Sequence, residues 1–148
     1  MDIEARLAVT SLMGRYANAI DHGESSSWTG TFTEDGVFRV FARDLETPVI
    51  SVQGQAELAG FMESMPPHNG ELTVMSNHMF GAIEFVSESA DEIRLRTRAA
   101  IFRMRDGEVG PPTNGTYVDV VQRENGEWRF AERVLEMDGA AIAARPGS

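Results

Sequence analysis

His78 is the residue of this chain best suited to acid–base chemistry. It lies in residues 72–86, a stretch rich in residues that favour β-strands. Because side chains alternate faces along a strand, His78 shares one face with Ser76 and Phe80. Imidazole has an unperturbed pKa of roughly 6.5, so a histidine on a pocket wall can act as a general acid or base at physiological pH. The alternative is a core histidine whose two ring nitrogens are hydrogen-bonded.

Asp21 stands where a predicted first helix ends. Apolar residues recur with helical spacing through residues 3–20, and Gly23 is placed to end the helix in a left-handed conformation. A carboxylate in the last turn of a helix is unfavourable, because the helix dipole leaves partial negative charge there. The position of Asp21 therefore indicates either a role beyond the helix or a carboxylate that is simply solvated. Tyr16 lies on the buried face of this helix, one turn before Ile20.

The remaining elements follow from hydrophobic periodicity and turn residues. In the first half of the chain, we expect a short helix at 25–32, a turn at 33–36 with Gly36 at positive φ, and strands at 37–41 and 49–52 around a loop at 42–48. A helix at 55–65 should follow and be ended by residues 66–70. The rest of the chain should form strands at 72–86, 92–105, 116–123 and 128–137. Gly81 is expected to form a bulge in its strand. Asn125 and Gly126 predict a tight hairpin turn.

Helices followed by long, mainly antiparallel strands predict an α+β fold. The sheet, mixed or antiparallel, should bend strongly around the N-terminal helices as a cone-shaped barrel with a central pocket, the default ligand site. We expect a single domain over residues 1–148, with its core at about 3–137 and a small, apolar tail at 138–148.

The composition disfavours several classes of function. The net charge of −10, from 23 acidic and 13 basic residues, argues against a nucleic-acid partner. Absence of cysteine removes disulfides, thiolate nucleophiles and thiolate metal sites. The three histidines, His22, His68 and His78, lack metal-ligand spacing, so no metal site is expected, and His68 should be exposed in a loop. The acidic N-terminus is unlike a signal peptide and no run could span a membrane, which predicts a soluble, cytoplasmic protein without a membrane partner.

Several local motifs in this order of elements resemble the SnoaL-like superfamily, also called the nuclear-transport-factor-2-like cone fold. They are RYANAIDHG at 15–23, FTEDGVF at 32–38, GTYVD at 115–119 and GEWRF at 126–130. The resemblance extends over about residues 3–137. It implies the fold more specifically than the reaction, because this fold hosts dehydratases, isomerases, cyclases, dehydrohalogenases, epoxide hydrolases and subunits without catalysis.

Within the superfamily, the chain is most similar to dehydratases of the scytalone dehydratase and bile-acid 7α-dehydratase type. In both, an aspartate at the end of the first helix supports a histidine on the long strand, and Asp21 and His78 occupy the matching positions. Tyr16 matches the first-helix tyrosine of the bile-acid enzyme, five residues before the aspartate.

The chain also departs from these relatives. Scytalone dehydratase has a tyrosine at the position of Ile20. Its second histidine lies on the following strand, where this chain offers Thr97, Ala99, Ile101 or Arg103. Ketosteroid isomerases share the first-helix tyrosine, but their base is an aspartate on the first strand, at about Val40 here. A steroid isomerase mechanism is therefore not expected.

The resemblance implies a lyase or isomerase without a cofactor, acting on a small cyclic or polyketide-like apolar substrate. A carboxylate bonded to one ring nitrogen fixes the imidazole tautomer and stabilises the imidazolium. His78 would be the acid–base group, Asp21 its orienting group, and Tyr16 the donor to an oxyanion or leaving group. Dehydration is favoured, while isomerisation, cyclisation and dehydrohalogenation need the same groups. The side chains expected to shape the substrate pocket, each also compatible with plain core, are Trp28, Phe38, Val40, Phe61, Met65, Thr97, Ile101 and Tyr117.

A non-catalytic ligand-binding or assembly subunit is the competing interpretation. A hydrogen bond between His78 and Asp21 inside a cavity open to solvent would favour the enzyme, and a cavity filled by side chains would favour the subunit. Arg94, Arg96 and Arg98 form a row on one face of a predicted strand, and an open sheet face of this kind usually finds cover. We therefore expect a homodimer or homotrimer packed through the sheets.

Overall fold

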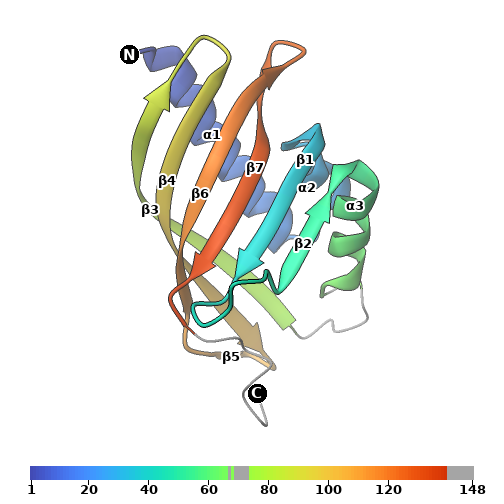
Figure 1. The fold of residues 1–148 in the computed structure, drawn as a ribbon. Helices are drawn as coiled ribbons and strands as arrows, with labels where there is room; N and C mark the ends of the chain where they lie inside the picture. The colour runs from blue at the N-terminus through green and yellow to red at the C-terminus, as the bar shows by residue number, and fades with distance from the viewer. Residues whose placement is uncertain (67, 69–73, 140–148) are drawn as a thin grey trace.

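The computed structural model describes residues 1–66, 68 and 74–139. Figure 1 shows a curved sheet with helices on one side of it. The helices are α1 (Ile3–Asp21), α2 (Ser25–Thr29) and α3 (Gly54–Ser64). The strands are β1 (Phe32–Phe41), β2 (Ile50–Gln53), β3 (Val74–Glu88), β4 (Glu92–Arg105), β5 (Glu108–Val109), β6 (Thr113–Glu124) and β7 (Glu127–Met137).

All seven strands belong to one mixed sheet. The order is β2-β1-β7-β6-β4-β3, and β5 pairs with β4. The pairing of β1 with β7 is parallel and the other described pairings are antiparallel. The α+β cone is thus confirmed, but the sheet is open rather than a closed barrel, since β2 and β3 form its two ends in the described part of the chain.

Helix α1 supplies one wall of the interior. It begins at Asp2, whose carboxylate accepts a hydrogen bond from the Ala5 amide at 3.0 Å, and it ends before Gly23, which has a φ of 67° as expected. The helix packs against β3 and β7, while α3 packs against β1 and β2 (Figure 1). Its buried face consists of Ala5, Val9, Leu12, Met13, Tyr16, Ala19 and Ile20. Tyr16 therefore points into the core of the cone.

The turn expected at residues 33–36 is wrong. Strand β1 already begins at Phe32, and Gly36 does not have positive φ. A Cβ atom at Gly36 would lie 2.7 Å from the Phe32 Cβ atom and 3.1 Å from the Phe130 carbonyl oxygen. Glycine is needed here because the backbones approach closely where the register between β1 and β7 shifts, not because of a turn.

Two other irregularities were predicted correctly. The register between β3 and β4 shifts between Phe80 and Ile83, which confirms the bulge at Gly81. Asn125 and Gly126 have φ values of 53° and 82°, as a tight hairpin turn between β6 and β7 requires. The short strand β5 was not among the predicted strands. Parts of the expected loop at 66–70 and of the strand start at 72, and the tail beyond Gly139, lie outside the described residues.

Candidate active site

The His78 side chain projects from β3 into the interior and is only 6% exposed. Its Nδ1 atom lies 2.6 Å from Oδ1 of Asp21, at the end of α1. The two residues are 57 positions apart in sequence, so this contact depends on how β3 packs against the last turn of α1. The sequence-based pairing of Asp21 with His78 is therefore present in the folded chain.

Asp21 is held by three hydrogen bonds from β3. Its Oδ1 accepts from the Ser76 hydroxyl at 3.0 Å as well as from the His78 ring, and its Oδ2 accepts from the His78 backbone amide at 2.8 Å. Burial alone would raise the pKa of Asp21, but the bonds from the His78 ring, the His78 amide and Ser76 hold that pKa below its ordinary value of 3.8. A carboxylate, and not a carboxylic acid, therefore faces the imidazole at neutral pH.

This arrangement defines the state of the imidazole. With Asp21 accepting from Nδ1–H, the neutral ring carries its lone pair on Nε2, which bonds to no residue in the described part of the chain. Nε2 is thus able to take up a proton, and Asp21 is placed to stabilise the imidazolium that would form.

His78 lines a cavity of about 150 Å³ that is mostly apolar. The cavity reaches solvent, because its wall includes the exposed residues Val49 and Arg103. The wall also includes Tyr16 and Tyr117. A hydrogen-bonded His78–Asp21 pair beside an open cavity is the arrangement that favours an enzyme over a filled, non-catalytic scaffold.

Tyr16 also lines this cavity, and its side chain is fully buried. Its ring meets the His78 ring edge to face, with centroids 6.2 Å apart. The hydroxyl is buried and has no hydrogen-bond partner among the described residues. Burial raises the pKa of Tyr16 above 10.0, with Arg133 acting in the opposite direction, so the phenol keeps its proton and remains a donor.

A buried ion pair beneath Tyr16 was not predicted from the sequence. Arg133 on β7 and Asp119 on β6 both have side chains that are 0% exposed, and Nη1 of Arg133 lies 3.6 Å from Oδ2 of Asp119. The guanidinium carbon lies 4.1 Å from the ring centroid of Tyr16 and 3.9 Å from that of Tyr117. Arg133 is therefore a cation held mainly by aromatic faces, directly behind two residues of the cavity wall.

Asp119 should make stability depend on pH. Burial raises its pKa from 3.8 to about 7, although Arg133 lowers it. Because the folded chain then binds this proton more tightly than the unfolded chain, the stabilisation is present at low pH and is lost as the pH rises from 3.8 to about 7. We expect the free energy of unfolding of Asp119→Asn, measured in urea titrations, to change less with pH over this range than that of the wild-type protein. If the free energies of unfolding of the two proteins differ by the same amount at every pH in this range, the raised pKa of Asp119 is contradicted.

Most of the residues expected around the pocket lie there. Those that line the cavity are Phe38, Val40, Phe61, Met65, Ile101 and Tyr117. Trp28 and Thr97 do not. Trp28 is fully buried behind the wall, with its ring centroid 5.6 Å from that of Phe61, and the Thr97 hydroxyl lies 3.9 Å from the Met13 sulfur in the core.

The wall also contains residues that were not predicted to bind substrate: Ile20, Val49, Ile50, Ser76, Arg103, Thr113, Leu135 and Met137. Alternation along β3 already placed Ser76 on the face of His78, which was the available signal for its contact with Asp21.

Within the described residues, no group of three or more His, Cys, Asp or Glu side chains could hold a metal ion. None of the described helices is long and apolar enough to cross a membrane.

Similar structures are known from bacteria. The beta subunit of a candidate aromatic-ring-hydroxylating dioxygenase from Novosphingobium aromaticivorans aligns with a TM-score of 0.79 and 22% identity, over 93% of this chain and 92% of that one. A candidate scytalone dehydratase from the same organism aligns with a TM-score of 0.74 and 20% identity, over 94% of this chain and 87% of that one. ActVI-ORFA from Streptomyces coelicolor aligns with a TM-score of 0.72 and 19% identity, over 90% of this chain and 98% of that one. At these identities the likeness shows the fold alone.

Family membership comes from the sequence comparison. No curated protein matches the chain. The family model of the SnoaL-like domain, in contrast, matches residues 1–134, which include both members of the His78–Asp21 pair. The chain therefore belongs to the SnoaL-like domain family, which includes polyketide cyclases and enzymes similar to scytalone dehydratase.

Proposed function

We propose that this chain is a cofactor-independent lyase that removes water from a small cyclic β-hydroxy ketone, with isomerisation by the same groups as the alternative. The observation that carries the proposal is the His78 ring, fixed by Asp21 through Nδ1 at 2.6 Å on the wall of an open, mostly apolar cavity. Membership in a family with dehydratase-like and cyclase members supports the reaction class. Cyclisation and dehydrohalogenation would use the same groups.

In the proposed reaction, Nε2 of His78 removes a proton from the carbon next to the substrate carbonyl. The electron pair of the C–H bond forms an enolate, whose oxygen accepts a hydrogen bond from the Tyr16 hydroxyl. When the enolate returns to a ketone, a carbon–carbon double bond forms and the bond from the β-carbon to its hydroxyl breaks. The departing oxygen takes the proton from the imidazolium, so water leaves and His78 returns to its starting state.

The reaction class can be tested with a panel of cyclic β-hydroxy ketones. We expect mass spectrometry to detect loss of water from at least one of them with the wild-type protein and not with His78→Ala. Equal loss of water with both proteins would count against the proposal, because the uncatalysed reaction would then explain the product.

Asp21→Asn should lower turnover by about a hundred-fold or more. The amide cannot stabilise an imidazolium, and its NH₂ group would face either the His78 amide or the ring N–H, both of which are donors. The turnover number and the thermal midpoint should be measured together. Glu24→Gln, which removes an exposed acid just beyond α1, is the matched control and should retain activity. Full activity in Asp21→Asn would exclude an orienting role for Asp21.

We also propose that the chain forms a homodimer or homotrimer through the outer face of the sheet. That face carries the exposed row Arg94, Arg96 and Arg98, and the end strand β3 exposes Met75 and Met79 by 54% and 56%. Exposed apolar side chains along a sheet edge favour association with a partner. Light scattering at micromolar concentration should give two or three times the chain mass, and a mass of 16.3 kDa would contradict the proposal.

A further inference from the structure

Strand β4 changes the chemistry of its inner face as it leaves the core. Five alternate residues on this face are buried: Ile93, Leu95, Thr97, Ala99 and Ile101. The next two on the same face, Arg103 and Arg105, are exposed. Arg94, Arg96 and Arg98, on the outer face, lie earlier in β4. The inner face therefore carries basic side chains only at the end of the strand nearest the cavity. Pairing with β3 continues to Arg105, hence the alternation is unbroken there.

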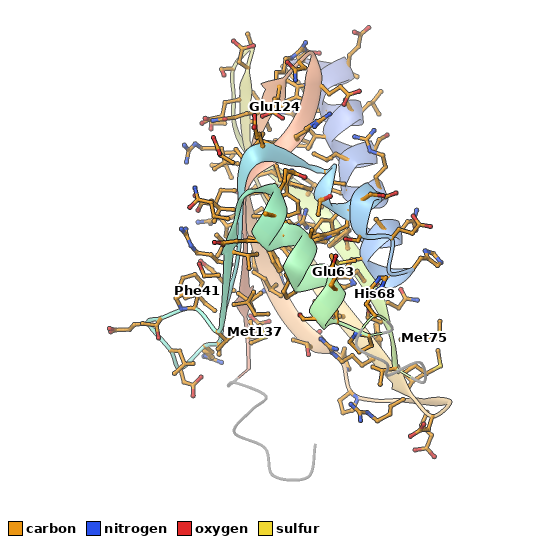
Figure 2. All side chains as sticks on the ribbon, turned by 90° about the vertical axis from the view of Figure 1, so that its right-hand side faces the viewer. Phe41, Glu63, His68, Met75, Glu124 and Met137 are labelled. Atoms are coloured by element: carbon orange, nitrogen blue, oxygen red, sulfur yellow. The ribbon has the colours of Figure 1, made fainter. Side chains whose placement is uncertain are left out.

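Arg103 stands at the mouth of the cavity. It lines the cavity together with His78, and it also lines a larger groove of about 980 Å³ outside it, between the β4–β5 hairpin and the end of β7. Met137, near the end of β7, lines both hollows, and Figure 2 shows it in the lower part of the molecule. Arg103 is thus one of three residues, with Thr113 and Met137, that line both the cavity and the groove.

The position of Arg103 relative to His78 is fixed by the sheet. Arg103 pairs directly with Ser76 across β3 and β4. His78 is two residues further along β3, which places its Cα atom roughly 7 Å beyond that of Ser76. A ring that reaches His78 could therefore carry a substituent that reaches the guanidinium group at the mouth.

No described acidic side chain neutralises Arg103. Of the described arginines, only Arg103 lines the cavity beside His78, and it forms neither an ion pair nor a side-chain hydrogen bond within the residues that the structure describes. Asp106 and Glu108 line the outer groove but form no ion pair with it. In a chain of net charge −10, a cation without an acidic partner at the entrance of an apolar cavity is suited to binding an anion.

We propose that Arg103 binds a carboxylate of the substrate, so that the molecule processed here is a cyclic organic acid. The apolar ring would occupy the cavity beside His78 and Tyr16, and its acid group would remain at the mouth. A guanidinium group bonds a carboxylate through two parallel N–H donors, and at a solvated mouth the carboxylate need not lose all of its hydration. This proposal rests on the proposed function, because it assumes that the cavity is the substrate site.

A matched pair of probes separates charge from shape. 2-Naphthoate and 2-naphthamide share the ring but differ in charge, and their binding can be followed by titration with ¹H–¹⁵N correlation spectra. We expect wild-type protein to bind the acid about tenfold more tightly than the amide, and Arg103→Gln to reduce this ratio to near one. Arg15→Gln, which removes the same charge from an exposed position of α1, should leave the ratio unchanged.

The outcomes distinguish the two proposals. If both probes shift the His78 and Tyr16 signals with equal affinity, or if Arg103→Gln leaves the ratio unchanged, the role of Arg103 is overturned while the cavity remains a ligand site. If Arg105→Gln removes the preference and Arg103→Gln does not, the assignment to Arg103 is likewise overturned. If neither probe shifts the His78 and Tyr16 signals, both this proposal and the cavity as the site of the proposed reaction fail.

Discussion

Replacing His78 with alanine should lower turnover by about a hundred-fold to ten-thousand-fold, the range expected for loss of a general acid–base group. The variant removes the ring atom Nε2. Of the two ring nitrogens, Nδ1 is bonded to Asp21, and only Nε2 is left open toward the cavity in the described structure. The fold should persist, because the side chain borders a cavity instead of filling the centre of the core. Turnover number and free energy of unfolding should be measured on the same preparation.

The matched control for this experiment is Asn77→Ala. Asn77 is the preceding residue of β3, and its exposed side chain points to the outer face of the sheet. We expect its turnover and stability to stay near those of the wild-type protein. If His78→Ala instead unfolds the chain by several kcal/mol, or leaves turnover unchanged, then His78 is structural and the chemistry belongs elsewhere.

Replacing Arg133 with methionine should destabilise the protein by about 3–5 kcal/mol at pH 8. The guanidinium is the charge nearest to Asp119, and both side chains are fully buried. Without it, the Asp119 carboxylate would be left without compensation among apolar side chains. The loss should be smaller at pH 5, because burial raises the pKa of Asp119 to about 7 and the protonated acid needs no cation. Urea denaturation at the two pH values measures both effects.

The double variant Arg133→Met with Asp119→Leu tests the cause of that loss. If the cost of the single variant comes from the orphaned carboxylate, removing the carboxylate as well should restore most of the stability. Simple addition of the two single-variant effects would contradict this explanation. It would show that the loss comes from the packing of Arg133 on the rings of Tyr16 and Tyr117 instead.

Local patterns placed Asp21 and His78 individually but did not predict the contact between them. Helical spacing placed Asp21 at the end of α1, and two-residue alternation placed Ser76 and His78 on one face of β3. Both features depend on near neighbours in sequence. The resemblance to dehydratases of known fold then supplied the long-range pairing that local patterns alone do not contain.

Arg133 was missed because a bulge changes the phase of β7. Trp128 and Phe130 point inward, and strict alternation from them would place Arg133 outward. The register instead shifts, so that Val121 pairs with Phe130 but Val120 pairs with Glu132, and the residues after Ala131 change faces. Ala131 carries no signal that predicts this shift, and a lone arginine in a strand ordinarily indicates an exposed position.

Trp28 and Thr97 illustrate a second limit. Both side chains are buried, as expected of residues that point inward. Whether an inward residue lines a cavity or fills the core depends on the side chains packed beside it, and these come from distant segments. Trp28 packs against Phe32, Phe38 and Phe61, which leaves it behind the cavity wall.

Asp21 should fix the His78 ring with Nε2 unprotonated and open toward the cavity. Two-bond ¹H–¹⁵N correlation spectra of the imidazole, recorded through a pH titration, test this directly without a known substrate. We predict that neutral His78 carries its proton on Nδ1, and that Asp21→Asn alters this tautomer preference. A neutral His78 ring with its proton on Nε2, or a tautomer preference that Asp21→Asn leaves unchanged, would show that Asp21 does not fix the ring.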